Sequence, residues 1–176
     1  IEDAIIDLLD NSIDGATQIN PNDLSGFVIN IEIDANKLSI RDNCGGFSLD
    51  RAQRYAFRFG RPEDAPTIKN SVGRFGIGMK RALFKMGKKF SVESQKDLEH
   101  FLVNVNVDEW CDKVKQVTTL DGKTIEIDDW TFESLTIDDR NSEDGTTIVV
   151  TDLKEDVKAL FGNDDFLRSL YVSITK

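Results

Sequence analysis

The chain has 176 residues, of which 39% are hydrophobic and 31% charged, as expected of one globular domain with a proper core. Its formal net charge of −10 argues against a surface that coats nucleic acid, because such surfaces are normally basic. Two cysteines, Cys44 and Cys111, and one histidine, His100, argue against a zinc site or a serine–histidine–aspartate triad, and predict free thiols in a reducing, cytoplasmic location.

The first fourteen residues, IEDAIIDLLDNSID, predict a helix. Its apolar residues recur at intervals of three and four and define one face: Ile1, Ala4, Ile5, Leu8, Leu9 and Ile13. Asp7, Asn11 and Asp14 form a second stripe, with Asp10 beside them. This stripe is either a solvated polar face or a site for a hard cation such as Mg²⁺, which prefers oxygen ligands. Because the stripe contains no Lys or Arg, ion pairs along the helix do not explain it.

A loop and a β-hairpin are expected next. Gly15 and the polar stretch 17–25 predict the loop. Apolar residues that alternate with polar ones predict two strands, near 27–33 and 38–42, joined by a turn at Asn36. The paired glycines of residues 43–46 predict a tight turn, and Ser48 is a good N-cap for a short helix over 49–57.

Residues 58–75 contain two prolines and two glycines with little periodicity, and an ordered loop of this length is typical of a lid or a binding loop. A glycine-rich turn with Gly73, Gly76 and Gly78 leads into a helix expected over 79–86, with Gly87 as its stop. The amides of such a turn can face a phosphate, whereas a plain flexible connection is the alternative. Neither the dinucleotide fingerprint of a doubly wound fold nor a Walker-type Gly-Lys-Ser/Thr sequence is present.

From Lys88 onward the pattern predicts mainly strands. The expected strands lie at 90–92, at 101–107, at one or two segments within 124–138, and at 146–151. The expected helices lie at 156–161 and 165–174. The order of helix, hairpin, helix, loop, helix and several strands, without a repeat or an internal boundary, predicts a single α+β domain built as a two-layer sandwich. No apolar run reaches the length that spans a membrane.

Two further polar positions are open to more than one interpretation. Asp42 ends a strand before paired glycines, so its carboxylate could accept a hydrogen bond from the amino group of a flat ring; it could equally cap its own turn. Gly145 and Thr146 begin a late strand, where a turn glycine before β-branched residues is the simpler explanation.

Taken in order, these motifs resemble the four boxes of the GHKL ATPases, the superfamily of gyrase, heat-shock chaperone ATPases, sensor histidine kinases and MutL. The motifs are Asp-x-x-Asp-Asn-Ser-x-Asp, Asp-Asn-x-Gly-Gly, Gly-x-x-Gly-x-Gly and Gly-Thr, and they span roughly residues 1–151. Phe59-Gly60 and residues 73–80 are most similar to the microrchidia-like branch. The resemblance implies a Bergerat fold, with a mixed, mostly antiparallel sheet and helices on one face. It also implies one ATP-binding domain over 1–176, with a lid at about 58–78.

The resemblance implies a role for each matching residue. Asn11 would hold Mg²⁺ and through it the phosphates of ATP, with Asp14 as a further nucleotide-binding residue. Asp42 would bind the adenine amino group, Gly46 would make room for the ring, and Thr146 would support Asp42 or its water. The residues around the phosphates would be Gly73, Phe75, Gly76, Ile77, Gly78, Met79 and Lys80.

Two positions depart from the family pattern. The general base is usually a Glu four residues before the Asn, and here that position is Asp7, whose side chain is one methylene shorter. Because a displacement of about 1 Å can lower a rate on the order of 10²-fold, slow hydrolysis is expected. Cys44 replaces the usual first glycine of the adenine box, which predicts a slightly different turn there.

Three functions are compatible with the resemblance. The first is a conformational switch driven by Mg·ATP, with weak hydrolysis of ATP to ADP and phosphate. The second is a nucleotide-binding module without useful turnover. The third, phosphotransfer to a protein histidine, is disfavoured because His100 falls on an expected strand.

Several expectations concern partners and chain length. Adenine nucleotide is the expected ligand, whereas membrane contact is not expected, and the net charge argues against nucleic acid contact by this domain. Because the chain begins inside a helical pattern and stops before the second domain of gyrase-like relatives, we expect it to be a fragment of a longer protein. An ATP-dependent homodimer is expected for that longer protein.

Overall fold

The computed structural model describes residues 1–57, 77–140 and 142–175. Most of the expected lid, including Gly73, Phe75 and Gly76, therefore lies outside the described residues. Only the end of the expected lid, from Ile77 to Gly78, falls within them, in the first turn of a helix.

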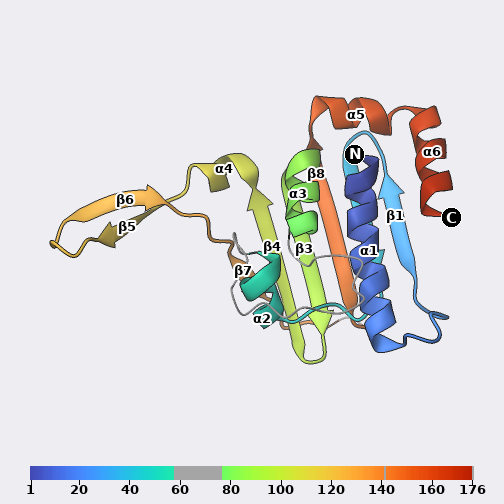
Figure 1. The fold of residues 1–176 in the computed structure, drawn as a ribbon, viewed down its shortest axis with the longest axis horizontal. Coiled ribbons are helices and arrows are strands. Elements are labelled where there is room, and N and C mark those ends of the chain that lie inside the picture. Colours follow the sequence, from blue (N-terminus) through green and yellow to red (C-terminus); the bar gives the residue numbers. More distant parts are fainter. Residues whose placement is uncertain (58–76, 141, 176) are drawn as a thin grey trace.

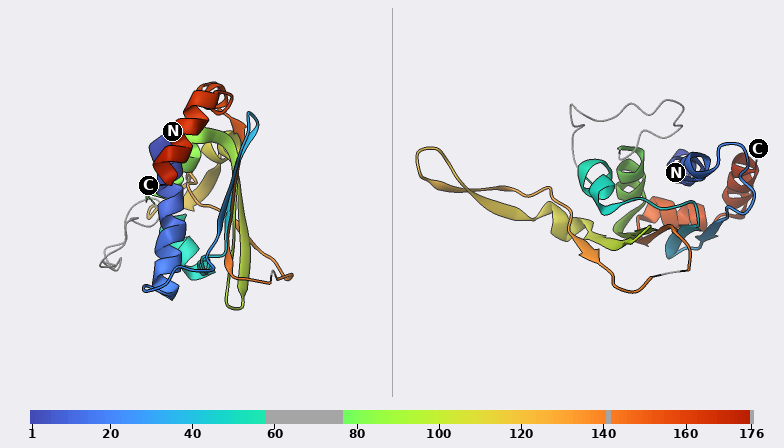
Figure 2. Two further views of the ribbon diagram at one scale, coloured as in Figure 1. Left: turned by 90° about the vertical axis from the view of Figure 1, so that its right-hand side faces the viewer. Right: turned by 90° about the horizontal axis from the view of Figure 1, so that it is seen from below.

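A six-stranded antiparallel sheet and a layer of helices on one of its faces make up the body of the protein (Figures 1 and 2). The strand order is β1-β2-β8-β3-β4-β7, and every neighbouring pair in the described part is antiparallel. These strands are β1 (Ile29–Ile33), β2 (Lys37–Asp42), β3 (Gly87–Lys96), β4 (Glu99–Asn106), β7 (Ser134–Thr136) and β8 (Gly145–Leu153). The predicted α+β architecture with a mostly antiparallel sheet is confirmed.

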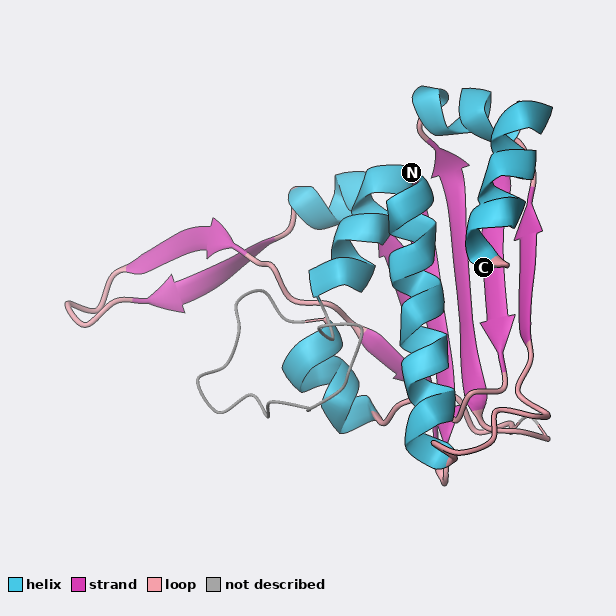
Figure 3. Cartoon of the chain, turned by 45° about the vertical axis from the view of Figure 1, so that its right-hand side comes forward, coloured by secondary structure: helices cyan, strands magenta, loops and turns pink. Residues whose placement is uncertain are grey.

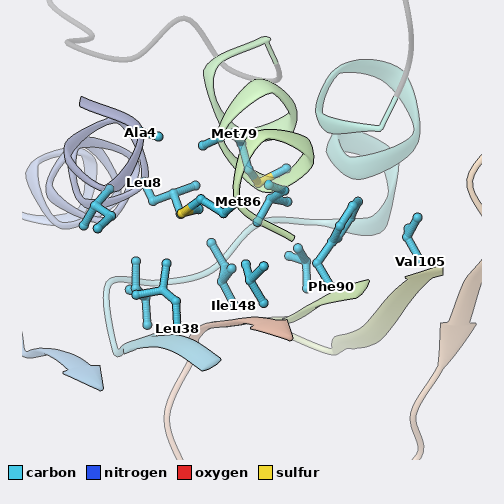
Figure 4. Packing of buried hydrophobic residues seen from close by; sticks show 14 of the residues in the cluster. Ala4, Leu8, Leu38, Met79, Met86, Phe90, Val105 and Ile148 are labelled. Carbon is cyan, nitrogen blue, oxygen red and sulfur yellow. The ribbon is translucent and has the colours of Figure 1, made fainter. Parts of the chain in front are cut away.

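The core lies between the sheet and helices α1 (Glu2–Ile19) and α3 (Ile77–Met86), as Figure 4 shows. Successive residues of a strand point to opposite faces of the sheet. Leu38 and Ile40 of β2 are therefore buried under the helices, whereas Arg41 is exposed on the other face. The same alternation along β3 and β8 buries Val92 and Val150. The period-two patterns read from the sequence thus correspond to one buried face.

Helix α1 continues to Ile19, so the loop predicted from Gly15 and 17–25 was wrong at its start. Gly15 does not break the helix. A Cβ on Gly15 would lie 2.6 Å from the carbonyl oxygen of Cys44, which shows that the glycine allows the helix to approach the turn 43–46. The helix ends where the amide of Asn20 donates to the carbonyl of Ala16.

The helix predicted over 49–57 is present as α2 (Leu49–Arg51) followed by a π-helical turn, η1 (Ala52–Ala56). The predicted N-cap is confirmed, because Ser48 Oγ accepts a hydrogen bond from the amide of Arg51 at 3.3 Å. Helix α3 begins at Ile77, two residues earlier than predicted. Strand β3 then starts at Gly87 immediately after the helix, so this glycine does stop the helix as expected.

Beyond β4 the prediction was incomplete. Val107 was expected to continue the strand, but it begins a short helix, α4 (Val107–Cys111). Strand β5 (Val114–Thr118) was missed, and it pairs with β6 (Thr124–Asp128) in a separate two-stranded sheet that projects from the body (Figure 3). One or two strands were expected within 124–138, and the structure has two there, β6 and β7.

Two helices follow β8: α5 (Glu155–Phe161) and α6 (Asp164–Ile174). Both were predicted from their apolar spacing, and both lie where they were expected. Within the described residues, no helix combines the length and the apolar character needed to cross a membrane.

Candidate functional site

Asp42 is held in one orientation by three hydrogen-bond donors from three separate segments. Ser12 Oγ of α1 donates to Oδ2 at 2.6 Å, and the amides of Cys44 and Thr146 donate to Oδ1 at 2.9 and 3.1 Å. Hydrogen bonds to a charged acceptor are roughly twice as strong as neutral ones. Since a carboxylate has about four acceptor positions, about one remains, on Oδ2, for an additional donor.

The turn that follows Asp42 packs tightly against the end of β3. Ser94 is buried there, and its Oγ accepts from the amide of Phe47 at 2.8 Å and donates to the Phe47 carbonyl at 3.2 Å. Gly46 has φ +53°, and a Cβ on it would lie 2.1 Å from the Gln95 carbonyl oxygen. Close backbone packing therefore explains this glycine by itself, whereas its expected role in making room for a ring stays a prediction.

Cys44 is buried in the same turn. Burial, together with the charge of Asp42, raises the pKa of its thiol to about 11. The thiol is therefore protonated at neutral pH, and Cys44 acts as a small apolar side chain under Asp42.

A second group of polar residues lies where α1 meets α3. Asp7 Oδ2 accepts a hydrogen bond from the guanidinium of Arg81 at 3.2 Å, and a Cβ on Gly78 would lie 3.5 Å from the same oxygen. Asn11 lies one turn further along α1, and its Nδ2 donates to the carbonyl of Asp7 at 3.0 Å. The first turn of α3 is thus packed directly against the acidic stripe of α1.

The stripe is not a uniformly solvated face. Asp14 is only 5% exposed. Burial of Arg51 lowers the pKa of its guanidinium, and the negative charge of Asp14 partly offsets this effect. The cationic partners that the helix itself lacks are supplied by other elements. Spacing along one helix could not reveal them, because Arg51 and Arg81 come from α2 and α3.

Asp10 lies beside the stripe in an electrostatically unfavourable environment. Burial, followed by the negative charges of Asp14 and Asp7, raises the pKa of its carboxyl group. A cation nearby would relieve this repulsion. No group of three or more Asp, Glu, His or Cys residues within the described ranges could hold a metal ion on its own. Mg²⁺ commonly takes one or two protein oxygens together with phosphates and water, so Asn11 Oδ1 fits an ion that arrives with a nucleotide.

Lys80 faces η1 in this structure. The side chain is buried, and its Nζ donates to the carbonyl of Tyr55 at 3.4 Å. Burial lowers the pKa of its ammonium group to about 8. Its expected contact with phosphate stays a prediction.

A polar cavity of about 250 Å³ lies at the same end of the sheet, and its lining includes Asn30, Arg41, Glu93 and Thr147. Arg41 alternates with the buried Ile40, so this cavity opens on the face of the sheet opposite to α1 and α3. Its lining also includes Asp42 and Thr146, so the cavity adjoins the Asp42 group, whereas it includes no residue of the contact between α1 and α3.

A family model described as histidine kinase-, DNA gyrase B-, and HSP90-like ATPase matches residues 1–152. The chain belongs to this family. The match to the GHKL family extends from α1 to the end of β8, so it includes both Asp42 with its donors and the contact between α1 and α3. None of the curated proteins compared with the chain matches it.

Two contacts of this GHKL domain, that of Ser12 with Asp42 and that of Arg81 with Asp7, were not predicted from the sequence. Ser12 lies on the buried face of α1, four residues from both Leu8 and Ala16, and a lone serine on an apolar face was the signal that could have revealed it. Arg81 lies three residues after Gly78 on the same helical face. Its contact with Asp7 joins positions 74 residues apart, so no local pattern indicates it.

Proposed function

We propose that this GHKL domain binds Mg·ATP along α1, between Asp42 and the first turn of α3. Binding would close the lid at about 58–78, and slow hydrolysis to ADP and phosphate would reset it. The single observation that carries the proposal is the Asp42 carboxylate, whose three donors leave an acceptor position open on Oδ2.

The chemistry of Asp42 favours adenine over guanine. An ionised carboxylate only accepts hydrogen bonds, so it would pair with the exocyclic amino group of adenine. Guanine presents a carbonyl oxygen at the equivalent position, and two acceptors facing each other are unfavourable. The donors from Ser12, Cys44 and Thr146 would prevent the carboxylate from turning away.

The phosphates would lie toward α3. Asn11 would contribute its Oδ1 to Mg²⁺, and Asp14 would support the same region. When bound, the ion would neutralise phosphate charge and orient the terminal phosphate. The amides of the glycine-rich turn, from Gly73 to Met79, would wrap the phosphates, with Lys80 as an additional contact.

Asp7 is the proposed general base, which would orient or deprotonate the attacking water. A specific observation also favours the second candidate, a binding module without turnover: Asp7 is shorter than the usual Glu, and its Oδ2 is engaged by Arg81 at 3.2 Å. Single-turnover measurement of phosphate release distinguishes the two candidates. Release that depends on Mg²⁺ and exceeds that of Asn11→Ala supports hydrolysis; equal rates leave only binding.

The variant Asp7→Glu identifies the cause of slow turnover. If the short side chain limits the reaction, restoring the methylene raises the single-turnover rate, by up to about 10²-fold. An unchanged rate would mean that the length of the side chain is not limiting. Nucleotide binding itself is tested by calorimetry with ATP, ADP and GTP, with and without Mg²⁺, and GTP binding as tight as ATP binding would refute the adenine assignment.

The finer expectations are also part of the proposal. They are an affiliation with the microrchidia-like branch, one domain over 1–176 within a longer protein, and ATP-dependent homodimerisation of that protein. They further include a cytoplasmic location and no contact of this domain with nucleic acid. The net charge of −10 supports the last of these.

A further inference from the structure

The nucleotide chemistry leaves one feature without a role: the polar cavity on the face of the sheet opposite to α1 and α3, which we call the outer face. The floor of the cavity is a row of four side chains from four neighbouring strands: Asn30 of β1, Arg41 of β2, Thr147 of β8 and Glu93 of β3. The strand register makes each of them the direct neighbour of the next. Neighbours of this kind have Cβ atoms about 5 Å apart. The row therefore forms one continuous polar surface.

One wall of the cavity is fixed by a buried glutamine. Gln95 of β3 is only 2% exposed, and its Nε2 donates to the carbonyl of Glu143 and to Oδ1 of Asp144, both at 3.2 Å. Asn43 adds a hydrogen bond from its Nδ2 to Oε2 of Glu143 at 3.3 Å. The chain that leads into β8 passes on the side of the sheet opposite to the helices (Figure 2). Hydrogen-bonded side chains, as well as the sheet, therefore bound the cavity.

Glu93 is held in place by the single histidine of the sequence. His100 of β4 is only 5% exposed, and its Nε2 lies 2.8 Å from Oε1 of Glu93. The other ring nitrogen, Nδ1, contacts the carbonyl oxygen of Asp139. The imidazole ring thus fixes one carboxylate oxygen of Glu93, whose side chain is 35% exposed. A carboxylate has about four acceptor positions, so Oε2 can accept hydrogen bonds from a ligand in the cavity.

Arg41 supplies the opposite charge at the other end of the row. Within the described ranges its guanidinium forms neither an ion pair nor a hydrogen bond, although Glu93 and Glu143 line the same cavity. Two strand spacings separate Arg41 from Glu93, which places their Cα atoms about 10 Å apart. Thr147 lies between them, and its hydroxyl can both donate and accept. The cavity therefore has a positive end, a polar centre and a negative end.

This arrangement of charges restricts the ligand. A ligand with only negative charge would bind Arg41 but meet repulsion from Glu93 and Glu143, and a ligand with only positive charge would meet repulsion from Arg41. A molecule with a carboxylate at one end and an ammonium group at the other matches both ends. A guanidinium binds a carboxylate through two parallel hydrogen bonds, and an ammonium group has three donors for the two glutamates. Asp42 also lines the cavity, but its carboxylate is engaged by the three donors described above.

We propose that this cavity binds a small zwitterion, with its carboxylate on Arg41 and its ammonium group on Glu93 and Glu143. The volume of about 250 Å³ sets the size of the ligand. A water molecule takes about 30 Å³ of the liquid, so the cavity holds a ligand of about eight non-hydrogen atoms. An ω-amino acid of four or five carbons has this size and both charges. Because the site lies on the outer face, it requires no nucleotide, and either proposal can fail without the other.

Titration of the whole isotope-labelled chain with 5-aminopentanoate, followed by NMR of the backbone amides, tests the proposal. We expect saturable shifts at Arg41, Glu93 and Thr147, with a Kd on the order of 1 mM for so small a ligand. Hexanoate replaces the ammonium group with a methyl group, and pentylamine lacks the carboxylate. At equal ionic strength both should bind at least about tenfold more weakly, as should inorganic phosphate. Equal affinity for hexanoate, or no saturable shift with 5-aminopentanoate up to about 20 mM, overturns the proposal.

Charge-removing variants assign the two ends of the ligand. Arg41→Met and Glu93→Gln keep the length of the side chain, and each should weaken 5-aminopentanoate binding at least about tenfold. The matched controls are Lys89→Met and Glu32→Gln, which remove the same charges from the outer face at positions outside the cavity lining. Both controls should leave the affinity unchanged, and the same spectra show that each variant is folded. Binding by Arg41→Met and Glu93→Gln that is as tight as binding by their controls overturns the proposal.

Discussion

Asp42→Asn is the substitution that separates nucleotide binding from folding most cleanly. The asparagine keeps the shape of the side chain and one carbonyl-type acceptor, but it replaces the second acceptor oxygen with an NH₂ donor. We expect the variant to fold and to lose adenine-nucleotide binding.

The hydrogen bonds around Asp42 give the size of both effects. The amides of Cys44 and Thr146 can still donate to the remaining oxygen, and the Ser12 hydroxyl can turn to accept from the new amide. Bonds to a charged group contribute about 1.5–3 kcal/mol and neutral ones about 0.5–1.5 kcal/mol, so the three changes lower the free energy of unfolding by about 3 kcal/mol at most. In the complex, the new donor faces the adenine amino group. A lost bond and unsatisfied donors together weaken binding by about 4 kcal/mol, or about a thousandfold.

Calorimetric titration with ATP and Mg²⁺ measures the binding effect, and urea denaturation measures the effect on stability. Asp34→Asn is the matched control, because Asp34 Oδ1 also accepts from two backbone amides, those of Asn36 and Lys37, but in the turn at the other end of β2. The control should bind ATP normally. A folded Asp42→Asn protein with an affinity within about threefold of the parent would refute the adenine assignment.

Three further predictions concern the surroundings of the site. Gly46→Ala should lower the free energy of unfolding by about 3 kcal/mol or more in thermal denaturation, because its Cβ would meet the Gln95 carbonyl at 2.1 Å; Gly26→Ala, with positive φ but nothing within 4 Å, should cost only about 1 kcal/mol. Ser94→Ala leaves the partly buried amide of Phe47 without its acceptor at 2.8 Å and should cost about 1–3 kcal/mol in urea denaturation. Burial lowers the Lys80 pKa from 10.5 to about 8, so between these values the unfolded chain binds a proton that the folded chain does not. The stability of the parent relative to Lys80→Met should therefore rise by up to about 3 kcal/mol from pH 8 to 10.5, and parallel pH curves would contradict this.

Most of the elements that were predicted correctly have side chains that contact the core. Strands β2, β3 and β8 alternate because one face is buried, and α5 and α6 show apolar spacing for the same reason. Strand β5 contacts no core, so all its residues are exposed and burial imposes no pattern on it. Gly15 indicated a helix end from local propensity alone. Its actual role depends on Cys44, which lies 29 residues away.

The candidate site shows the same division between local and tertiary information. The resemblance identified Asp42 and Thr146, and the structure brings them together across 104 residues by pairing β2 with β8. The roles assigned to them in nucleotide binding stay predictions. The contacts of Ser12 and Arg81 were not predicted, because each depends on a partner on another element. Composition and spacing describe one segment at a time, so they do not predict contacts between side chains on different elements.

Helix α1 connects the two groups of residues on which the proposed switch depends. Ser12 holds Asp42 at one point of the helix, and Asp7, five residues earlier and about 7.5 Å along the axis, contacts Arg81 of α3. The first contact is a charge-assisted hydrogen bond of a buried serine. The second is an ion pair whose Arg81 side chain is 73% exposed, and such pairs contribute about 0–1 kcal/mol. Phosphates that competed for Arg81 would therefore break this ion pair at little cost, while the buried apolar contacts of α1 with α3 and the adenine end stayed in place. The proposed switch requires this asymmetry, because movement has to be confined to the side where ATP and ADP differ.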